Sequence, residues 1–553
     1  PLDCTDGCVL LTLLSWVPPA RFRRLRRRFA MATNGDSPET YNYRDSALRQ
    51  HQEPLLSAAA TEPPQAVERR STLFSICPYI LGNEFCERLA YYGLATNLVV
   101  YFQSYAGMSA SGAVAQVGLW SGSCYVTPLI GAWLADSYFG RYKTILGFTL
   151  IYFVGMIALS LHPILFAPTL GELPSPGANW LLYGALYTIA LGTGGIKPNV
   201  SAFGADQFDM RFPQDRAEKN SFFNWFYFAI NLGSLLASLV VVYIQENVSW
   251  SIGFLIPTVA LGLATVSFWA GNGLYKHTPP KVSPLARLSK VLWTAFTTPP
   301  PESGVTDWLD RATLNGKFTA RQVNEVRAVV RVMPVFFTSV LYWTVYQQMS
   351  SVFVEQGMQM DRKIYGDFEI PAASLSTFDT VAIIVLVPVF DRGIYPFLTR
   401  HGFKLSMLRR MGAGLLVAAL AMVTAAVVET YRLEIARAGL LVPGTNPPAA
   451  QMSVWWQTPQ YVLIGMSEVL ASIAQLEFFY SEAPAVMRSC AMALQLLSSA
   501  TGMYLSSGIV WLLDRFTQED PWIRDNLNEG HLDYYFYLLA VLTLWNLVFH
   551  VIV

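Results

Sequence analysis

Three charged residues lie close together in an otherwise apolar stretch of the chain, in the run Glu84-Phe85-Cys86-Glu87-Arg88. Spacings of three and four place Glu84, Glu87 and Arg88 on one face of a helix, which Tyr91 continues. Such a cluster is either a salt bridge that fixes helix packing or a proton-binding site whose carboxylates are poised by the arginine. We favour the proton site, because ionisable groups inside a membrane are usually functional.

A second polar position lies in the run from Gly192 to Pro198, which contains three glycines and Lys197. The glycines predict close approach of another helix. Lys197 lies at a depth similar to that of Glu84, so an ion pair with Glu84 or Glu87 is one expectation. The alternative is a lysine whose ammonium reaches out to the membrane interface.

A third polar face predicts a site in the second half of the chain. Glu468, Ser472 and Gln475 follow one another at spacings of four and three, so they share a helix face. Glu477 points to the opposite side and is interpreted as interfacial or structural. Asp379 is as consistent with local hydrogen bonding as with a site role. Four aromatic residues beside these positions are expected to line a cavity: Tyr91, Tyr92, Trp343 and Tyr346.

These polar positions lie in a chain that is unusually rich in apolar residues. Of its 553 residues, 53% are apolar and 14% are charged, whereas globular chains carry about 25% charged residues. Basic and acidic residues balance at 38 each, which argues against a nucleic-acid partner. Stretches of about 20 apolar residues are long enough to cross a bilayer as helices. We predict twelve spans: 76–101, 113–135, 143–163, 179–203, 221–244, 252–274, 332–353, 372–390, 410–428, 454–480, 490–513 and 534–553.

Basic residues are concentrated in alternate connections, which predicts that these connections and both termini face the cytoplasm. Only Arg88 and Lys197 are counted as basic residues inside the spans. The predicted divisions are a disordered cytoplasmic tail (1–71), six helices (72–274), a cytoplasmic linker with a polar helix (275–331) and six more helices (332–553). Met31 is interpreted as the native start, so residues 1–30 are left out of the fold.

The short connection after the second span contains Asp136 and Arg141. An acid and a base that bracket a tight turn can pair or cap neighbouring helix ends, so we interpret them as a conformational latch. The cysteines lack the spacing of metal ligands. The sequence also lacks the nucleophile motifs of hydrolases. We therefore expect a solute carrier without metal or cofactor, and not an enzyme.

Several motifs, taken together and in order, resemble the proton-dependent oligopeptide transporter family. Within the major facilitator superfamily the chain looks most like the plant nitrate and peptide transporter branch, and in particular the plant dipeptide transporters. The resemblance covers roughly residues 72 to 553. It rests on these segments: 84–93, 131–141, 192–199, 203–209, 223–234 and 475–480.

The resemblance implies an all-α fold of twelve helices in two six-helix bundles, alternating access and proton symport. Protons are then the only coupling ion. It implies that Glu84, Glu87 and Arg88 take part in proton coupling. It also implies that Lys197 or Arg88 faces a peptide carboxylate and Glu468 its ammonium. The other expected substrate contacts are Tyr91, Tyr92, Trp343, Tyr346, Gln348 and Ser472.

Two positions depart from the resembled pattern. Many relatives carry an acidic residue where this chain has Gln348, and some nitrate carriers have a histidine where it has Tyr346. The leading hypothesis is a proton-coupled importer of di- and tripeptides, in the plasma membrane rather than the vacuolar membrane. Nitrate or another small organic solute is the close alternative, and a solute sensor with little transport is the alternative from another class.

Overall fold

The computed structural model describes residues 71–166, 176–280, 284–299, 307–314, 316–366, 368–403, 405–484 and 486–552. The predicted tail lies outside these residues, apart from Ser71.

The first part of the chain folds into helices that coincide with the first six predicted spans. Pro78 stands in the first turn of the first long helix, where its missing N–H costs no hydrogen bond. A π-helical turn, Ala135–Phe139, joins two long helices directly, and a second one, Ala237–Val241, interrupts another. The helices are α4 (Thr72–Ser75), α5 (Cys77–Ala95), α6 (Leu98–Ala106), α7 (Ala110–Leu134), α8 (Gly140–Leu165), α9 (Pro176–Ile196), α10 (Val200–Asp206), α11 (Pro213–Leu236), α12 (Val242–Asn247) and α13 (Trp250–Ala270).

The last part of the chain holds the other six predicted spans. Its helices are α17 (Met333–Tyr346), α18 (Val352–Met358), α19 (Thr377–Val389), α20 (Tyr395–Arg400), α21 (Met407–Arg437), α22 (Thr458–Ser481), α23 (Arg488–Phe516) and α24 (Leu532–Ile552). Four short strands accompany them: β1 (Met360–Asp361) pairs in parallel with β4 (Ala450–Ser453), and β2 (Lys363–Tyr365) pairs antiparallel with β3 (Phe368–Glu369).

Between the two parts lie α14 (Pro284–Thr297), α15 (Arg311–Leu314) and α16 (Ala320–Arg331). The predicted polar helix is confirmed as α16. Thr319 and Gln322 form a reciprocal capping box at its first turn, which satisfies two backbone donors that a helix start leaves free.

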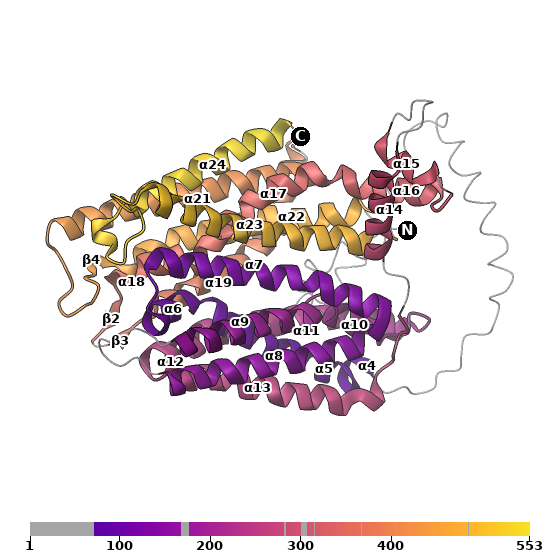
Figure 1. The fold of residues 1–553 in the computed structure, drawn as a ribbon, viewed down its shortest axis with the longest axis horizontal. Helices are drawn as coiled ribbons and strands as arrows, with labels where there is room; N and C mark the ends of the chain where they lie inside the picture. The colour runs from indigo at the N-terminus through magenta and orange to yellow at the C-terminus, as the bar shows by residue number, and fades with distance from the viewer. Residues whose placement is uncertain are drawn as a thin grey trace.

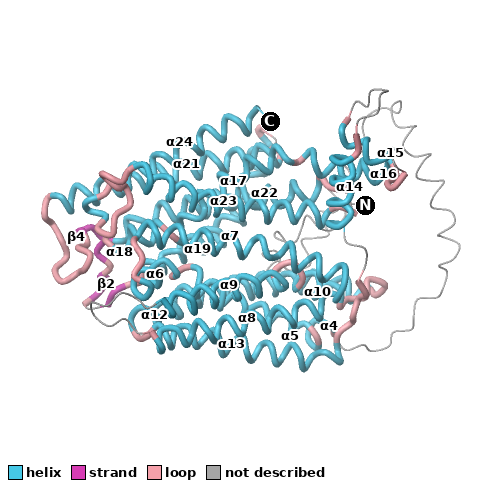
Figure 2. The backbone as a smooth tube through the Cα atoms, in the orientation of Figure 1, coloured by secondary structure: helices cyan, strands magenta, loops and turns pink. Residues whose placement is uncertain are grey.

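Figure 1 shows two groups of helices that run along a common direction, α4–α13 in one and α17–α24 in the other. We call them the N half and the C half. Helices α14–α16 lie at one end of the molecule, and the strands lie at the other (Figures 1 and 2). Among the described residues, nine helical stretches are long and apolar enough to cross a membrane, and one of them, Ala110–Leu165, contains two predicted spans.

Glycines bring α9 against its neighbours, as the sequence predicts. A Cβ on Gly131 of α7 would lie 2.1 Å from the carbonyl oxygen of Gly194. A Cβ on Gly192 would lie 2.5–2.6 Å from Tyr152 of α8, including its backbone. Side chains at these positions would push α9 away, so the glycines fix the place of Lys197, which follows the last residue of α9.

The two halves are tied together at the strand end. The Gln103 amide donates to the Glu355 carboxylate at 3.0 Å, and Arg362 forms an ion pair with Glu246 at 3.1 Å. Further hydrogen bonds across the halves join Ala110 to Asp525, Ser374 to Ser238 and Ser507 to Ala115. These contacts close the interface between the halves on the side away from α14–α16.

Candidate functional site

The charged cluster of α5 is a buried ion-pair triad. Glu84, Glu87 and Arg88 are 4%, 0% and 8% exposed. The Arg88 guanidinium pairs with Glu84 at 3.1 Å, one turn away on the same helix, and also with Glu87. One cation therefore holds two carboxylates in a place that excludes water. Because burying charges is costly unless they are paired, this arginine is the reason that both acids are tolerated here.

Lys197 lies in the turn between α9 and α10, with its ammonium held against aromatic rings. Its Nζ is 3.9 Å from the ring centroid of Tyr91 and 4.2 Å from that of Tyr125. The nitrogen is buried and has no hydrogen-bond partner. The expected ion pair with Glu84 or Glu87 is absent from the described residues, because Arg88 holds both carboxylates. The interfacial alternative is also wrong, since the ammonium points into the protein.

Tyr125 was not singled out from the sequence. It stands on α7, in a span without charged residues, and no spacing links it to Lys197. Two aromatic faces attract a cation through their ring quadrupoles but leave its hydrogen-bond donors unused. Lys197 is therefore a desolvated cation that is available to an incoming anionic group.

In the C half, two acids come from adjacent helices: Asp379 of α19 is buried, and Glu468 of α22 is half-buried. The Glu468 carboxylate lies near the Tyr346 hydroxyl and interacts electrostatically with Asp379. Asp379 is 4% exposed, and a Cβ on Gly465 would lie 3.1 Å from its Oδ1, so this oxygen faces α22 one turn before Glu468. One oxygen of each acid is buried without a hydrogen-bond donor. The arrangement favours a site role for Asp379 over local hydrogen bonding.

The two polar clusters face the same space between the halves. Tyr92, one turn from Arg88 on α5, interacts electrostatically with Arg88, Glu468 and Asp379. Tyr125 likewise interacts with both Arg88 and Glu468. Tyr92 and Tyr125 are therefore near charged groups of both halves. The site thus has a basic wall in the N half, formed by Arg88 and Lys197. It has an acidic wall in the C half, formed by Asp379 and Glu468.

Other predicted site residues are engaged by the protein itself. Trp343 donates its indole N–H to Gln475 at 3.1 Å, and Gln475 donates to Ser498 at 2.8 Å. The sequence predicts Gln475 on the same helix face as Glu468, but its side-chain amide is engaged by Trp343 and Ser498. Ser472 is half-buried on α22.

Gln348 is fully buried between α17, α23 and α24. Its amide donates to Ser506 at 2.9 Å and its carbonyl accepts from the Tyr535 hydroxyl at 3.0 Å. In this conformation the side chain links three helices and has no free group for a substrate. The predicted substrate contact is therefore replaced here by helix packing.

Asp136 and Arg141, the two residues of the predicted latch, do not pair with each other. Arg141 pairs with Asp206 of α10 at 2.5 Å and not with Asp136, and the Thr278 hydroxyl donates to the same carboxylate at 3.3 Å. This contact joins the α7–α8 turn to α10 and to the segment after α13, all within the N half. Glu477 pairs with Arg410 at 2.8 Å.

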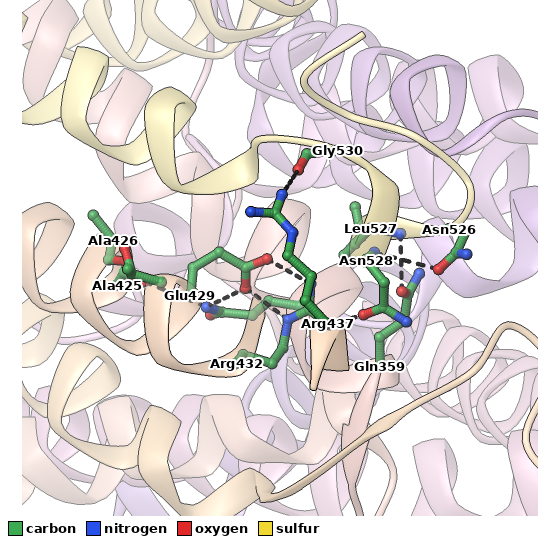
Figure 3. A network of polar contacts seen from close by, with 12 residues as sticks. Gln359, Ala425, Ala426, Glu429, Arg432, Arg437, Asn526, Leu527, Asn528 and Gly530 are labelled. Atoms are coloured by element: carbon green, nitrogen blue, oxygen red, sulfur yellow. Dashed lines mark hydrogen bonds and ion pairs between the residues drawn. The ribbon is translucent and has the colours of Figure 1, made fainter. Parts of the chain in front are cut away.

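A further buried ion pair lies far from these walls, near the strand end of the C half (Figure 3). Glu429 and Arg432 on α21 are both 0% exposed and pair at 2.6 Å. Gln356 donates to Glu429 at 3.0 Å, and Arg432 donates to the side-chain amide oxygen Oδ1 of Asn528 at 2.6 Å. The count of basic residues inside the spans leaves Arg432 out, because α21 continues past residue 428 and buries this side chain.

The family model described as the POT family matches residues 142–524. The chain belongs to the POT family of membrane transporters. Protein NRT1/PTR FAMILY 8.3 of Arabidopsis thaliana is 44% identical, over 88% of this chain and 91% of the relative. The POT family transporter PepTSo has a similar structure, with a TM-score of 0.70 and 26% identity over 88% of this chain and 99% of that one.

A second solved structure, of a proton dependent oligopeptide (POT) family transporter, is 26% identical with a TM-score of 0.63, over 86% of this POT family chain and 99% of that one. The predicted all-α membrane fold and the family resemblance are therefore confirmed. The chain is an integral membrane transporter and not an enzyme.

Proposed function

We propose that this transporter is a proton-coupled symporter that imports di- and tripeptides by alternating access. The observation that carries the proposal is the pair of opposed walls. A buried ammonium without a hydrogen-bond partner, that of Lys197, belongs to the N half. Buried carboxylate oxygens without donors, on Glu468 and Asp379, belong to the C half. A peptide carries one charge of each sign, so its termini satisfy both walls.

Proton coupling is assigned to the α5 triad. Arg88 holds Glu84 and Glu87 at once, so protonation of one carboxylate would weaken its hold on the guanidinium. The released arginine could then join Lys197 in binding the substrate carboxylate. In this scheme a proton prepares the basic wall, and the two halves rock around the site once both are filled. The expected link from Glu84 and Glu87 runs through Arg88 instead of Lys197.

The contacts at the strand end fit one of the two states of such a cycle. They close the interface on the side away from α14–α16. If α14–α16 face the cytoplasm, as the distribution of basic residues predicts, the closed side is the outer one. We therefore propose that the structure is a state closed on its outer side. The plasma membrane is the membrane that we propose for this transporter.

Nitrate fits the acidic wall less well than a peptide does. The residue at the position where some nitrate carriers have a histidine is Tyr346, which lies against the Glu468 carboxylate. An anion gains nothing from a site beside a second anion.

The test is uptake in oocytes of a labelled dipeptide and of labelled nitrate, each at acidic and at neutral external pH. Dipeptide uptake that rises at acidic pH, with an inward current, is the expected result. Nitrate uptake without dipeptide uptake would overturn the substrate assignment but keep the coupling. Dipeptide binding without accumulation would favour a sensor.

A further inference from the structure

Helix α14 presents an exposed aromatic and basic face at the end of the bundle that holds α14–α16. Trp293 and Phe296 are 72% and 73% exposed, and their spacing of three puts them on one face. Lys290 lies one turn before Trp293 on the same face and is also exposed. The Phe296 ring contacts that of Trp308 at 4.8 Å between centroids, but most of both aromatic side chains stays exposed, which indicates that something covers them.

The opposite face of α14 is anchored to the transporter. Val291 and Ala295 are fully buried and pack with Met487 and Cys490 at the start of α23. Helix α23 is one of the stretches that can cross a membrane, so α14 lies at the level where such a span ends. Figure 1 shows α14 running across the direction of the long helices, and therefore along the membrane surface.

A groove of about 490 Å³ runs beside this face. It is lined by Ser289, Lys290, Trp293, Thr294, Lys317 and Phe318. The two lysines and the Thr294 hydroxyl can donate to the oxygens of a phosphate, whereas the Ser289 hydroxyl donates to the Ala286 carbonyl, and this lining contains no acid. Tryptophan is enriched at the headgroup level of bilayers, where its ring meets apolar chains and its N–H meets water.

We propose that this groove binds an anionic phospholipid of the adjacent leaflet, with the headgroup phosphate between Lys290 and Lys317 and the acyl chains against Trp293 and Phe296. The charge of the lining selects an anion. The exposed aromatic rings select a molecule that is apolar next to its anionic group, which a lipid is and a soluble anion is not. A helix that lies along the membrane surface with basic and aromatic side chains is suited to this role.

The test measures lipid binding to the purified full chain in detergent by native mass spectrometry. Wild type is titrated with phosphatidylserine, phosphatidylcholine and glycerophosphoserine, the last being the same headgroup without acyl chains. We expect phosphatidylserine to bind most tightly. In Lys290→Gln/Lys317→Gln its affinity should fall by about 30-fold, because each lysine near an anionic surface contributes roughly fivefold. Trp293→Ser/Phe296→Ser should bind phosphatidylserine more weakly as well.

The matched control is Lys143→Gln/Lys363→Gln, which removes two exposed lysines elsewhere on the chain. It should keep the wild-type affinity. If the first double variant fails to fold, Lys317→Gln alone, in an exposed bend, should lose about fivefold. An equal loss in the control, an unchanged affinity in Lys290→Gln/Lys317→Gln, or equal binding of glycerophosphoserine would overturn the proposal. So would displacement of the lipid by an acidic peptide at lower concentration, since that would make the groove a protein-binding surface.

Discussion

Two buried charged groups in this molecule differ in how completely their polar atoms are satisfied. Around Glu429 and Arg432, amide groups from α18 and from the segment before α24 complete the hydrogen bonds (Figure 3). At the central site, the Lys197 ammonium and one oxygen each of Asp379 and Glu468 have no partner. Glu429 and Arg432 are 0% exposed, and the unpartnered atoms of Lys197, Asp379 and Glu468 are buried as well, so burial of the polar atoms alone does not separate structure from function.

This difference in hydrogen bonding distinguishes a structural role from a binding role. A buried charge whose partners are all supplied by the protein holds helices together and has nothing left to offer. A buried charge with free donors or acceptors destabilises the fold unless a ligand completes it. By this criterion Glu429 and Arg432 are structural, and the two walls await a substrate. The predictions below test that separation.

The largest effect is expected on proton coupling. Glu87→Gln removes one of the two carboxylates that hold Arg88, so acid-driven accumulation of dipeptide should fall to the level of uninjected oocytes. Surface abundance is measured in parallel. Glu434→Gln, an exposed carboxylate on α21, is the control and should behave as wild type. Full acid-stimulated uptake by Glu87→Gln would refute the coupling role.

The next largest effect separates the two kinds of buried charge by stability. Glu429→Gln leaves the Arg432 guanidinium buried without its counter-ion, which should cost about 3–5 kcal/mol and lower the unfolding temperature in detergent. Glu468→Gln removes a carboxylate that forms no ion pair with any described residue, so the unfolding temperature should stay the same or rise. An equal fall of the unfolding temperature in both variants would show that Glu429 and Glu468 do not differ in their contribution to stability.

A smaller effect is expected from the aromatic support of Lys197. Tyr125→Leu removes one of the two rings against the ammonium, a contact of about 0.5–2 kcal/mol. The KM for dipeptide should rise by a few-fold, while the maximal rate at saturating substrate should change less. Tyr125→Phe keeps the ring and should restore the wild-type KM. If the leucine and phenylalanine variants behave alike, the ring does not position Lys197.

Much of the fold could be predicted because apolar length and helix periodicity are local signals. All twelve predicted spans coincide with described helices. The ion pairs of the α5 triad could also be predicted, since spacings of three and four place its residues on one helix face. Partners that are distant in the sequence were not. Arg141 meets Asp206, 65 residues away, and Lys197 meets Tyr125 on another helix.

Arg432 was missed for a different reason. It follows the predicted end of a span, where a basic residue normally marks the membrane interface. The structure continues α21 to Arg437 and buries Arg432 under the segment before α24, at Asn528. Gln348 was assigned from the resemblance to a family position, which carries no information on the hydrogen bonds that the neighbouring helices supply.

The proposed function requires that the N half binds the substrate carboxylate and that the C half binds its ammonium. The most direct test is competition of labelled dipeptide uptake by the same dipeptide with its carboxylate amidated or its amine acetylated. It is measured in wild type, Lys197→Gln and Glu468→Gln. Amidation should weaken competition in wild type and in Glu468→Gln but no longer in Lys197→Gln. Acetylation of the amine should weaken competition in wild type and in Lys197→Gln but not in Glu468→Gln. Equal penalties in all three proteins, or the reverse assignment, would contradict the account.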